Sequence, residues 1–107
     1  MRKLIVIFLA GVGTFGQAWA LDEAAAEGLA RKSGCLKCHG VDKKKDGPSL
    51  KEIAAKYKGK TDAQKKLVTQ ITTTPKVKID GIEEDHEALK TKDAAQVTNV
   101  VQWILSR

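Results

Sequence analysis

The sequence predicts an all-α domain of about four helices, and two observations lead to this prediction. Capping signals of helices recur along the chain, as in Ser49-Leu-Lys-Glu52. Apolar residues recur at helical spacing near the C-terminus, where they form a stripe with Trp103 at its border: Val97, Val100, Val101, Ile104 and Leu105. Because no strand-rich pattern surrounds the cysteines, we expect helices packed on helices.

The first twenty residues have the pattern of an export signal and not of a folded element. Two cationic residues precede the apolar run Leu4–Val12, which is too short to span a bilayer comfortably, and Ala18-Trp19-Ala20 follows as a small-x-small cleavage site. We therefore expect residues 1–20 to be a signal peptide cleaved after Ala20. Residues 21–107, which number 107 − 20 = 87, then form one domain. A retained membrane anchor stays open as the alternative, although polar and small residues dilute the end of the segment.

The mature chain is only mildly basic. The whole chain has 19 Lys and Arg against 13 Asp and Glu, and removing Arg2 and Lys3 leaves 17 − 13 = +4. These charges are interspersed with acids, and aromatic residues are too few to stack bases. We therefore expect no nucleic-acid partner.

The helix signals follow one another in a simple order. Residues 22–33 form the first expected helix, with an aspartate as N-cap and a glycine just after its end. A lysine-rich loop over residues 40–48 leads to a helix over residues 50–57, which the serine of the capping box begins. A second capping-box pattern predicts a helix over residues 61–72.

The remaining segment divides into a loop and a helix. Residues 76–90 show no helical or strand period, and a loop of this length is usually functional or disordered. Thr91 is the expected N-cap of a last helix that ends near Ser106.

The pentapeptide Cys35-Leu36-Lys37-Cys38-His39 has the form C-x-x-C-H, which is the attachment motif of a c-type haem. Two thiols at this spacing can add to the two vinyl groups of one porphyrin edge. His39 directly follows and supplies a proximal imidazole to the iron. The motif therefore predicts one covalent haem c.

Two cysteines at this spacing also occur in sites that hold no haem. A structural zinc site needs about four nitrogen or sulfur ligands, but the chain has only two Cys and two His, and His86 is 86 − 39 = 47 residues from His39. A thioredoxin-like dithiol belongs to a βαβ pattern, which is not found here. A plain disulfide between Cys35 and Cys38 remains open.

Together with the haem motif, Gly47-Pro48-Ser49-Leu50 and Val101-Gln102-Trp103-Ile104-Leu105 resemble the small bacterial class I cytochromes c, of the monohaem c551/c8-like kind. The resemblance covers residues 22–107. It implies that the Pro48 carbonyl accepts a hydrogen bond from Nδ1 of His39. It also implies that the first and last helices cross beneath the haem edge, with Trp103 in the aromatic position of the last one. Because such proteins receive their haem outside the cytoplasm, we expect a periplasmic location.

The sixth ligand departs from this resemblance. Relatives usually bind iron with a methionine from the loop before the last helix, but the only Met here is Met1, which is lost with the signal. His86 stands where that methionine would fall, so we expect His39 and His86 to be the two metal ligands. The alternatives are an open sixth position or a lysine ligand, taken from Lys76, Lys78, Lys90 and Lys92. A second departure is Ala30, where relatives often carry an aromatic residue.

Two strong axial ligands predict a one-electron carrier and not an enzyme, because no coordination site is left for a substrate. Bis-histidine ligation also predicts a lower potential than in Met-ligated relatives. We expect a monomer that is not inserted in a membrane and that meets redox partner proteins through their acidic patches. The lysines expected near the haem edge are Lys37, Lys43, Lys44, Lys45, Lys76 and Lys78. The alternative function is a haem-based small-ligand binder or sensor, or a peroxidase-like protein, with a displaceable sixth ligand.

Overall fold

The computed structural model describes residue 11 and residues 20–107. Apart from Gly11 and Ala20, the expected signal peptide therefore lies outside the described residues, and its cleavage stays a prediction. Within the described part of the chain, no helix is long and apolar enough to cross a membrane.

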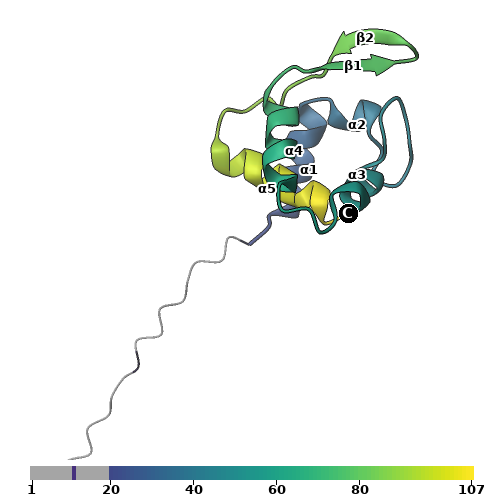
Figure 1. Cartoon of the computed structure of the whole chain (residues 1–107). Helices are drawn as coiled ribbons and strands as arrows, with labels where there is room; N and C mark the ends of the chain where they lie inside the picture. The colour runs from purple at the N-terminus through teal and green to yellow at the C-terminus, as the bar shows by residue number, and fades with distance from the viewer. Residues whose placement is uncertain (1–10, 12–19) are drawn as a thin grey trace, which may run out of the picture.

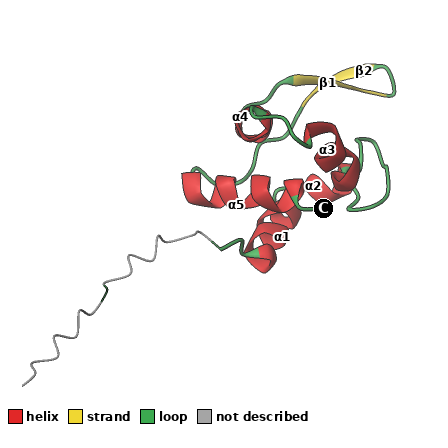
Figure 2. Ribbon diagram, turned by 60° about the horizontal axis from the view of Figure 1, so that its bottom comes forward, coloured by secondary structure: helices red, strands yellow, loops and turns green. Residues whose placement is uncertain are grey.

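Helices dominate the fold, as the sequence predicted, and a small hairpin is added to them (Figures 1 and 2). The elements in order are α1 (Glu23–Lys32), α2 (Cys35–Cys38), α3 (Leu50–Tyr57), α4 (Ala63–Thr72), β1 (Lys76–Ile79), β2 (Ile82–Asp85) and α5 (Ala94–Leu105). The four expected helices are present, and the fifth is the single turn that holds the two cysteines.

Two N-caps formed as the sequence indicated. The backbone N–H of Ala25 donates to Asp22 Oδ1 over 3.0 Å at the start of α1. At α3, the N–H of Glu52 donates to Ser49 Oγ over 3.1 Å. Each bond satisfies a backbone donor that a helix leaves free at its first turn.

The other two helix starts were predicted wrongly. Asp62, and not Thr61, is the N-cap residue of α4, and its carboxylate pairs with Lys66 at 3.0 Å without capping the backbone. Asp93, and not Thr91, caps α5 by accepting the N–H of Gln96 over 2.9 Å. Thr91 instead accepts the N–H of Asp93 over 3.1 Å, so it shapes the approach to the helix.

The core lies along α5, which packs against α1, α3 and α4. Ala26 and Ala30 of α1 are 0 % and 1 % exposed, so their small side chains face α5 within the core. Trp103 is 2 % exposed, which places it inside the core and not at the border of the apolar stripe. The absence of an aromatic residue at Ala30 is therefore matched by close packing of α1 on α5.

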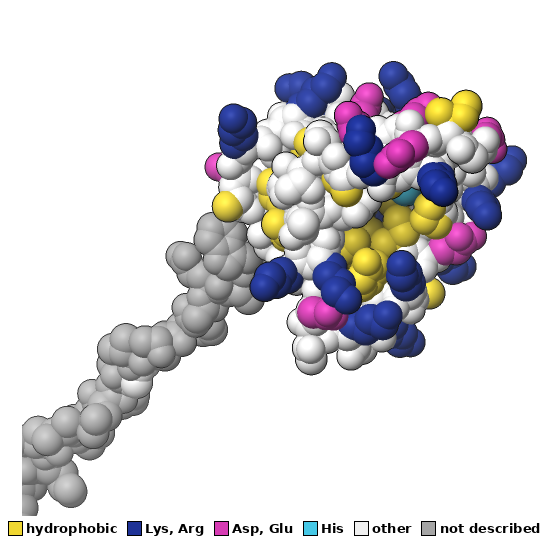
Figure 3. Space-filling view, turned by 45° about the horizontal axis from the view of Figure 1, so that its top comes forward, with side chains coloured by type: hydrophobic (Ala, Val, Ile, Leu, Met, Phe, Trp, Pro, Cys, Tyr) yellow, Lys and Arg dark blue, Asp and Glu magenta, His cyan; other side chains and the backbone are white. Residues whose placement is uncertain are grey.

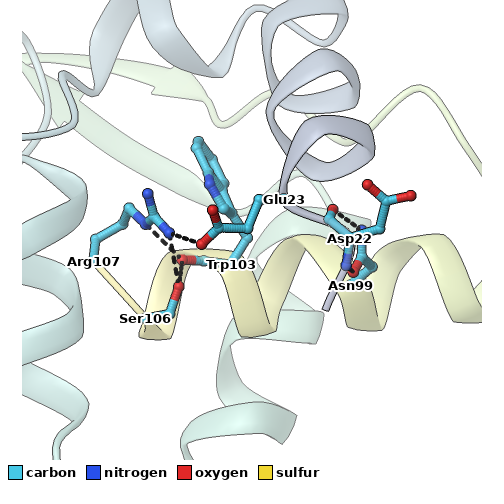
Figure 4. A network of polar contacts seen from close by, with 6 residues as sticks. All are labelled: Asp22, Glu23, Asn99, Trp103, Ser106 and Arg107. Carbon is cyan, nitrogen blue, oxygen red and sulfur yellow. Dashed lines mark hydrogen bonds and ion pairs between the residues drawn. The ribbon is translucent and has the colours of Figure 1, made fainter. Parts of the chain in front are cut away.

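Polar contacts also join the start of α1 to α5 and to the C-terminal residue (Figure 4). Asn99 of α5 accepts the N–H of Asp22 over 3.0 Å and donates to the Asp22 carbonyl over 2.8 Å. Arg107 pairs with Glu23 at 2.6 Å, and its guanidinium lies 5.4 Å from the Trp103 ring centre. These contacts fix the crossing of α1 and α5 on which the rest of the fold is built.

A β-hairpin occupies residues 76–85, where the sequence analysis predicted a loop, and this part of the prediction is wrong. Strands β1 and β2 are antiparallel, and the turn between them is Asp80-Gly81, with φ values of 52° and 79°. Two residues with positive φ are typical of the tight turn that suits the twist of a hairpin. Both strands are mostly exposed, and the alternation of polar and apolar residues is limited to the four residues of β1, which is too short a stretch to predict a strand.

Candidate functional site

The two cysteines lie on one helical turn. Gly34 precedes α2 with φ of 81°, a conformation that glycine adopts without a steric penalty. Residues three apart on a helix share a face, so the turn places Cys35 and Cys38 on the same side. Both side chains are partly exposed, and no disulfide joins them. The arrangement suits two thiols that react with one planar group and argues against the disulfide alternative.

His39 ends this turn and is held by the loop that follows. Its Nδ1 lies 2.7 Å from the carbonyl oxygen of Pro48. A carbonyl can only accept, so Nδ1 carries the proton and donates it, which leaves the lone pair on Nε2. A ring fixed in this tautomer presents Nε2 to a metal ion.

Gly47 makes this contact possible, although the sequence analysis treated it only as part of a motif. A Cβ atom at residue 47 would lie 2.6 Å from His39 Cε1 and 2.9 Å from Nδ1. The N–H of Gly47 also donates to the Cys38 carbonyl over 2.8 Å. The loop therefore packs its backbone directly on the imidazole, and only glycine leaves space for the ring.

We expect Gly47→Ala to destabilise the haem-loaded protein by about 1–3 kcal/mol, because the added methyl must displace the His39 ring or the loop. The measurement is denaturant unfolding of the oxidised protein. Gly28→Ala is the matched control, since a Cβ atom there meets nothing within 4 Å. That control lies within α1 and should gain about 0.5–1 kcal/mol. Equal stability of the two variants would contradict the close packing at residue 47.

His86 comes from the opposite side of the site, directly after β2. Its backbone N–H donates to the Pro75 carbonyl over 2.8 Å, and the N–H of Leu89 donates to the Ile71 carbonyl over 2.8 Å. These two bonds anchor the segment to the end of α4. The centres of the His39 and His86 rings are 6.1 Å apart, with 50° between the ring planes.

This ring separation fits a metal ion between the two histidines. Bonds from imidazole nitrogen to a metal are about 2 Å long, so two rings that bind one metal from opposite sides have centres about 6 Å apart. Nδ1 of His86 is buried and has no hydrogen-bond partner among the described residues. A buried polar atom without a hydrogen-bond partner is unusual in a folded protein and calls for an explanation, such as a functional role of the ring.

The surroundings of His86 favour the neutral imidazole that binds metals. Burial lowers the pKa of His86 below its ordinary value, and the charge of a protonated His39 lowers it further. Backbone groups of Glu87 and Gln70 act in the opposite direction on this pKa. Two imidazoles and two thiols are the donor set that a covalently attached, doubly ligated haem would require. Among the described residues, no cluster of three or more His, Cys, Asp or Glu could hold a bare metal ion.

A hollow lined by hydrophobic side chains opens beside a histidine, and Lys or Arg side chains surround it (Figure 3). Lys45 belongs to this edge, because its Nζ donates to the Leu36 carbonyl within the haem motif over 2.8 Å. The loop of Lys43 to Lys45 also meets the motif through the pairing of His39 with Lys44. The hollow has the apolar lining that a porphyrin needs.

Lys76 and Lys78, which the sequence analysis put near the haem edge and among the possible iron ligands, point away from His86. Lys76 pairs with Asp85 at 2.6 Å, and Lys78 stands opposite Glu83 in the hairpin. Because side chains alternate along a strand, both lysines lie on the face of the hairpin opposite to His86. Lys90 and Lys92 are exposed.

Trp103 lies in the core with Ala26 and Ala30.

Comparison with known proteins identifies a single family. The cytochrome c family model matches residues 23–107. Among curated relatives, cytochrome c-551 of Allochromatium vinosum is 49% identical over 43 residues, which are 40% of this chain and 46% of that protein. Cytochrome c-552 of Hydrogenobacter thermophilus is 30% identical over 99% of this chain and 98% of its own length. The match to the first of these relatives thus spans about half of that protein.

Solved structures share the fold. Class 1 cytochrome MtoD from Sideroxydans lithotrophicus ES-1 is 50% identical, with a TM-score of 0.77 over 81% of this chain and 97% of the other. Cytochrome c552 of Nitrosomonas europaea is 32% identical, with a TM-score of 0.57 over 75% of this chain and 96% of the other.

Proposed function

The chain belongs to the cytochrome c family, and from this premise we propose that it is a periplasmic one-electron carrier whose haem iron is bound by both His39 and His86. Proteins of the family transfer electrons and hold one covalent haem c, which the single C-x-x-C-H motif of this chain matches. When bound, the haem supplies an iron that changes oxidation state by one electron.

Each side chain of the site has one task in this proposal. Cys35 and Cys38 hold the haem through thioether bonds. His39 would bind the iron through Nε2, because its Nδ1–H donates a hydrogen bond to the Pro48 carbonyl over 2.7 Å. His86 binds from the other side, held by its backbone bond to Pro75. Two ligands on anchored segments stay in place when the charge changes, which keeps the cost of electron transfer low.

The observation that carries the proposal is the 6.1 Å between the two ring centres. No methionine other than Met1 exists to compete for the iron. Imidazole donates more strongly than a thioether and favours ferric iron, so the potential should be below that of a His/Met site. Potentiometric titration of the exported protein tests the function: it should give a reversible one-electron curve, and an irreversible couple would contradict it.

Glu87 is the acidic residue that we expect to lower the potential further. Its Oε2 lies 3.1 Å from where a Cβ atom of Gly34 would be, directly before the haem motif. Burial raises the pKa of the Cys35 thiol, and the charge of Glu87 adds to that rise. The carboxylate therefore lies beside the cysteine that we expect to carry the haem, whereas Glu83, Glu84 and Asp85 belong to the exposed strand β2.

We expect Glu87→Gln to raise the potential by about 40 mV, since a lost attraction to ferric haem of about 1 kcal/mol corresponds to that shift for one electron. Glu83→Gln is the matched control on exposed β2 and should leave the potential nearly unchanged. Both are measured by redox titration at one ionic strength. Equal shifts in the two variants would show that the position of Glu87 has no special effect.

The lysines beside the haem motif are proposed to meet acidic patches of redox partners. Lys37 lies within the motif and Lys43, Lys44 and Lys45 follow it, and all four are exposed. Their charge would steer a partner toward the hollow of Figure 3. We no longer include Lys76 and Lys78 among these docking residues, because they stand opposite the acids of β2. We also propose that the protein acts as a monomer after loss of residues 1–20.

A further inference from the structure

The hairpin is not needed to place His86, because the residues at its two ends already lie side by side. Its two ends are joined where the N–H of His86 donates to the Pro75 carbonyl over 2.8 Å. Residues 76–85 project from the helices as a hairpin, which Figure 1 shows, and the chain returns beside Pro75. A direct connection between Pro75 and His86 would span the distance, so the ten residues of Lys76 to Asp85 call for another explanation.

The register divides the hairpin into two different faces. Residues directly opposite in an antiparallel pair share a face. The charged face carries Lys76 opposite Asp85 and Lys78 opposite Glu83. The apolar face carries Val77 opposite Glu84 and Ile79 opposite Ile82.

The charges of the two faces are balanced differently. On the charged face, Lys76 and Asp85 pair at 2.6 Å, and Lys78 has an acid directly across from it. Glu84 on the apolar face and Asp80 at the turn form no ion pair with any described residue. The unbalanced charge of the hairpin is therefore negative and stands at both ends of the apolar face.

The apolar face lies on the same side of the hairpin as the iron ligand. The bond from His86 to Pro75 continues the register by one more pair, so the side chain of His86 alternates onto the apolar face. Its ring points toward His39. Ile82 is four residues before His86, or about 13 Å along the strand. It is 64% exposed, the large hydrophobic residue that stands out on the described surface.

We propose that the apolar face, with Asp80 and Glu84 at its rim, docks a redox protein that presents an apolar contact edged by Lys or Arg. This inference rests on the proposed carrier function. The complementary partner is cationic because the uncompensated charges here are carboxylates. A second copy of the chain docked through the same face would place carboxylates opposite carboxylates, and their like charges would repel. The surface differs in sign from the lysine cluster beside the haem motif, so two partners of opposite charge dock at different places.

Small redox reagents test this chemistry on the haem-loaded protein. Tris(phenanthroline)cobalt(III) is an apolar cation, and hexaammineruthenium(III) is a hydrophilic cation of equal charge. Each takes one electron from the ferrous protein, which becomes ferric while cobalt(III) or ruthenium(III) becomes divalent. The second-order rates are followed by stopped flow in the wild type and in Ile82→Ser, Glu84→Gln and Glu83→Gln.

We expect Ile82→Ser to slow the phenanthroline reagent about fivefold, through lost apolar contact, and to leave the ammine rate unchanged. Glu84→Gln should slow both cations about twofold. Glu83→Gln, on the charged face, is the matched control and should slow neither. An equal effect of Ile82→Ser on both reagents would overturn the proposal, because the residue would then act through the iron site.

A second measurement does not depend on electron transfer. Redox-inert tris(phenanthroline)ruthenium(II) should shift the backbone amide resonances of residues 77–84 in the reduced protein. Shifts confined to the lysine loop, or an Ile82-dependent dimer in sedimentation, would overturn the proposal. Failure of the carrier function itself looks different: the wild type would then exchange electrons with neither reagent.

Discussion

Replacing His86 with Ala is expected to turn a low-spin haem into a high-spin haem that binds carbon monoxide. The ring centres of His86 and His39 are 6.1 Å apart, and no thioether other than that of Met1 exists to replace the imidazole. Without a sixth strong ligand the iron changes spin state, and the ferrous form gains a free site. The optical spectra of both oxidation states, with and without carbon monoxide, measure this change.

The control for this variant is His86→Met, which offers a different ligand from the same position. If the loop delivers the sulfur, the protein should stay low-spin and its potential should rise, because a thioether favours ferrous iron. An unchanged low-spin spectrum in His86→Ala would mean that a lysine binds the iron. Rapid binding of carbon monoxide by the unmodified protein would favour the small-ligand binder instead.

Replacing Cys35 or Cys38 with Ser is expected to remove one thioether bond. Replacing both should leave no haem attached to the protein after acid extraction. The effect on folding should also be large. The predicted domain of 107 − 20 = 87 residues would have a marginal core, and a bound haem would supply apolar surface for that core to pack on. We expect little folded protein to accumulate from the double variant.

Lys37→Ser is the matched control for the cysteine variants. Lys37 stands between the two cysteines and is exposed, so its loss should leave attachment intact. The measurement is the mass of the purified protein together with haem absorbance after acid extraction. Covalent haem in the double cysteine variant would contradict the assignment of the motif.

Local signals in the sequence were enough where a helix has a good cap and a clear apolar stripe. The bounds predicted for α3, Leu50–Tyr57, are those of the structure, because the capping box at Ser49 fixes the start. The stripe of α5 was also predicted, and it forms the core. The starts of α4 and α5 were wrong because neighbouring residues in the sequence could also cap: Asp62, which pairs with Lys66, precedes α4, and Asp93 caps α5 by accepting the N–H of Gln96.

The hairpin was missed although Asp80-Gly81 is a turn signal. Its strands are short and mostly exposed, and only the four residues of β1 alternate between polar and apolar, so the pattern is too short to predict a strand. The role of Lys76 could not be read from the sequence for the same reason. Only the register shows that it pairs with Asp85 and faces away from His86.

In the candidate site, Cys35, Cys38 and His39 follow from spacing alone, whereas His86 required a count of methionines. Its distance from His39 depends on how the hairpin returns to Pro75, which is a tertiary property. The tight contact of Gly47 with the His39 ring is likewise invisible in a linear motif.

Ligation of one iron by both histidines is the central claim, and nitrogen couplings measured at low temperature test it most directly. The chain has only two His residues, so labelling histidine with ¹⁵N marks His39 and His86 and nothing else. Pulsed electron paramagnetic resonance of the oxidised, labelled protein should show a low-spin ferric signal with two strongly coupled labelled nitrogens, one bound nitrogen from each imidazole. A single strongly coupled labelled nitrogen, or a high-spin signal, would contradict ligation by His86.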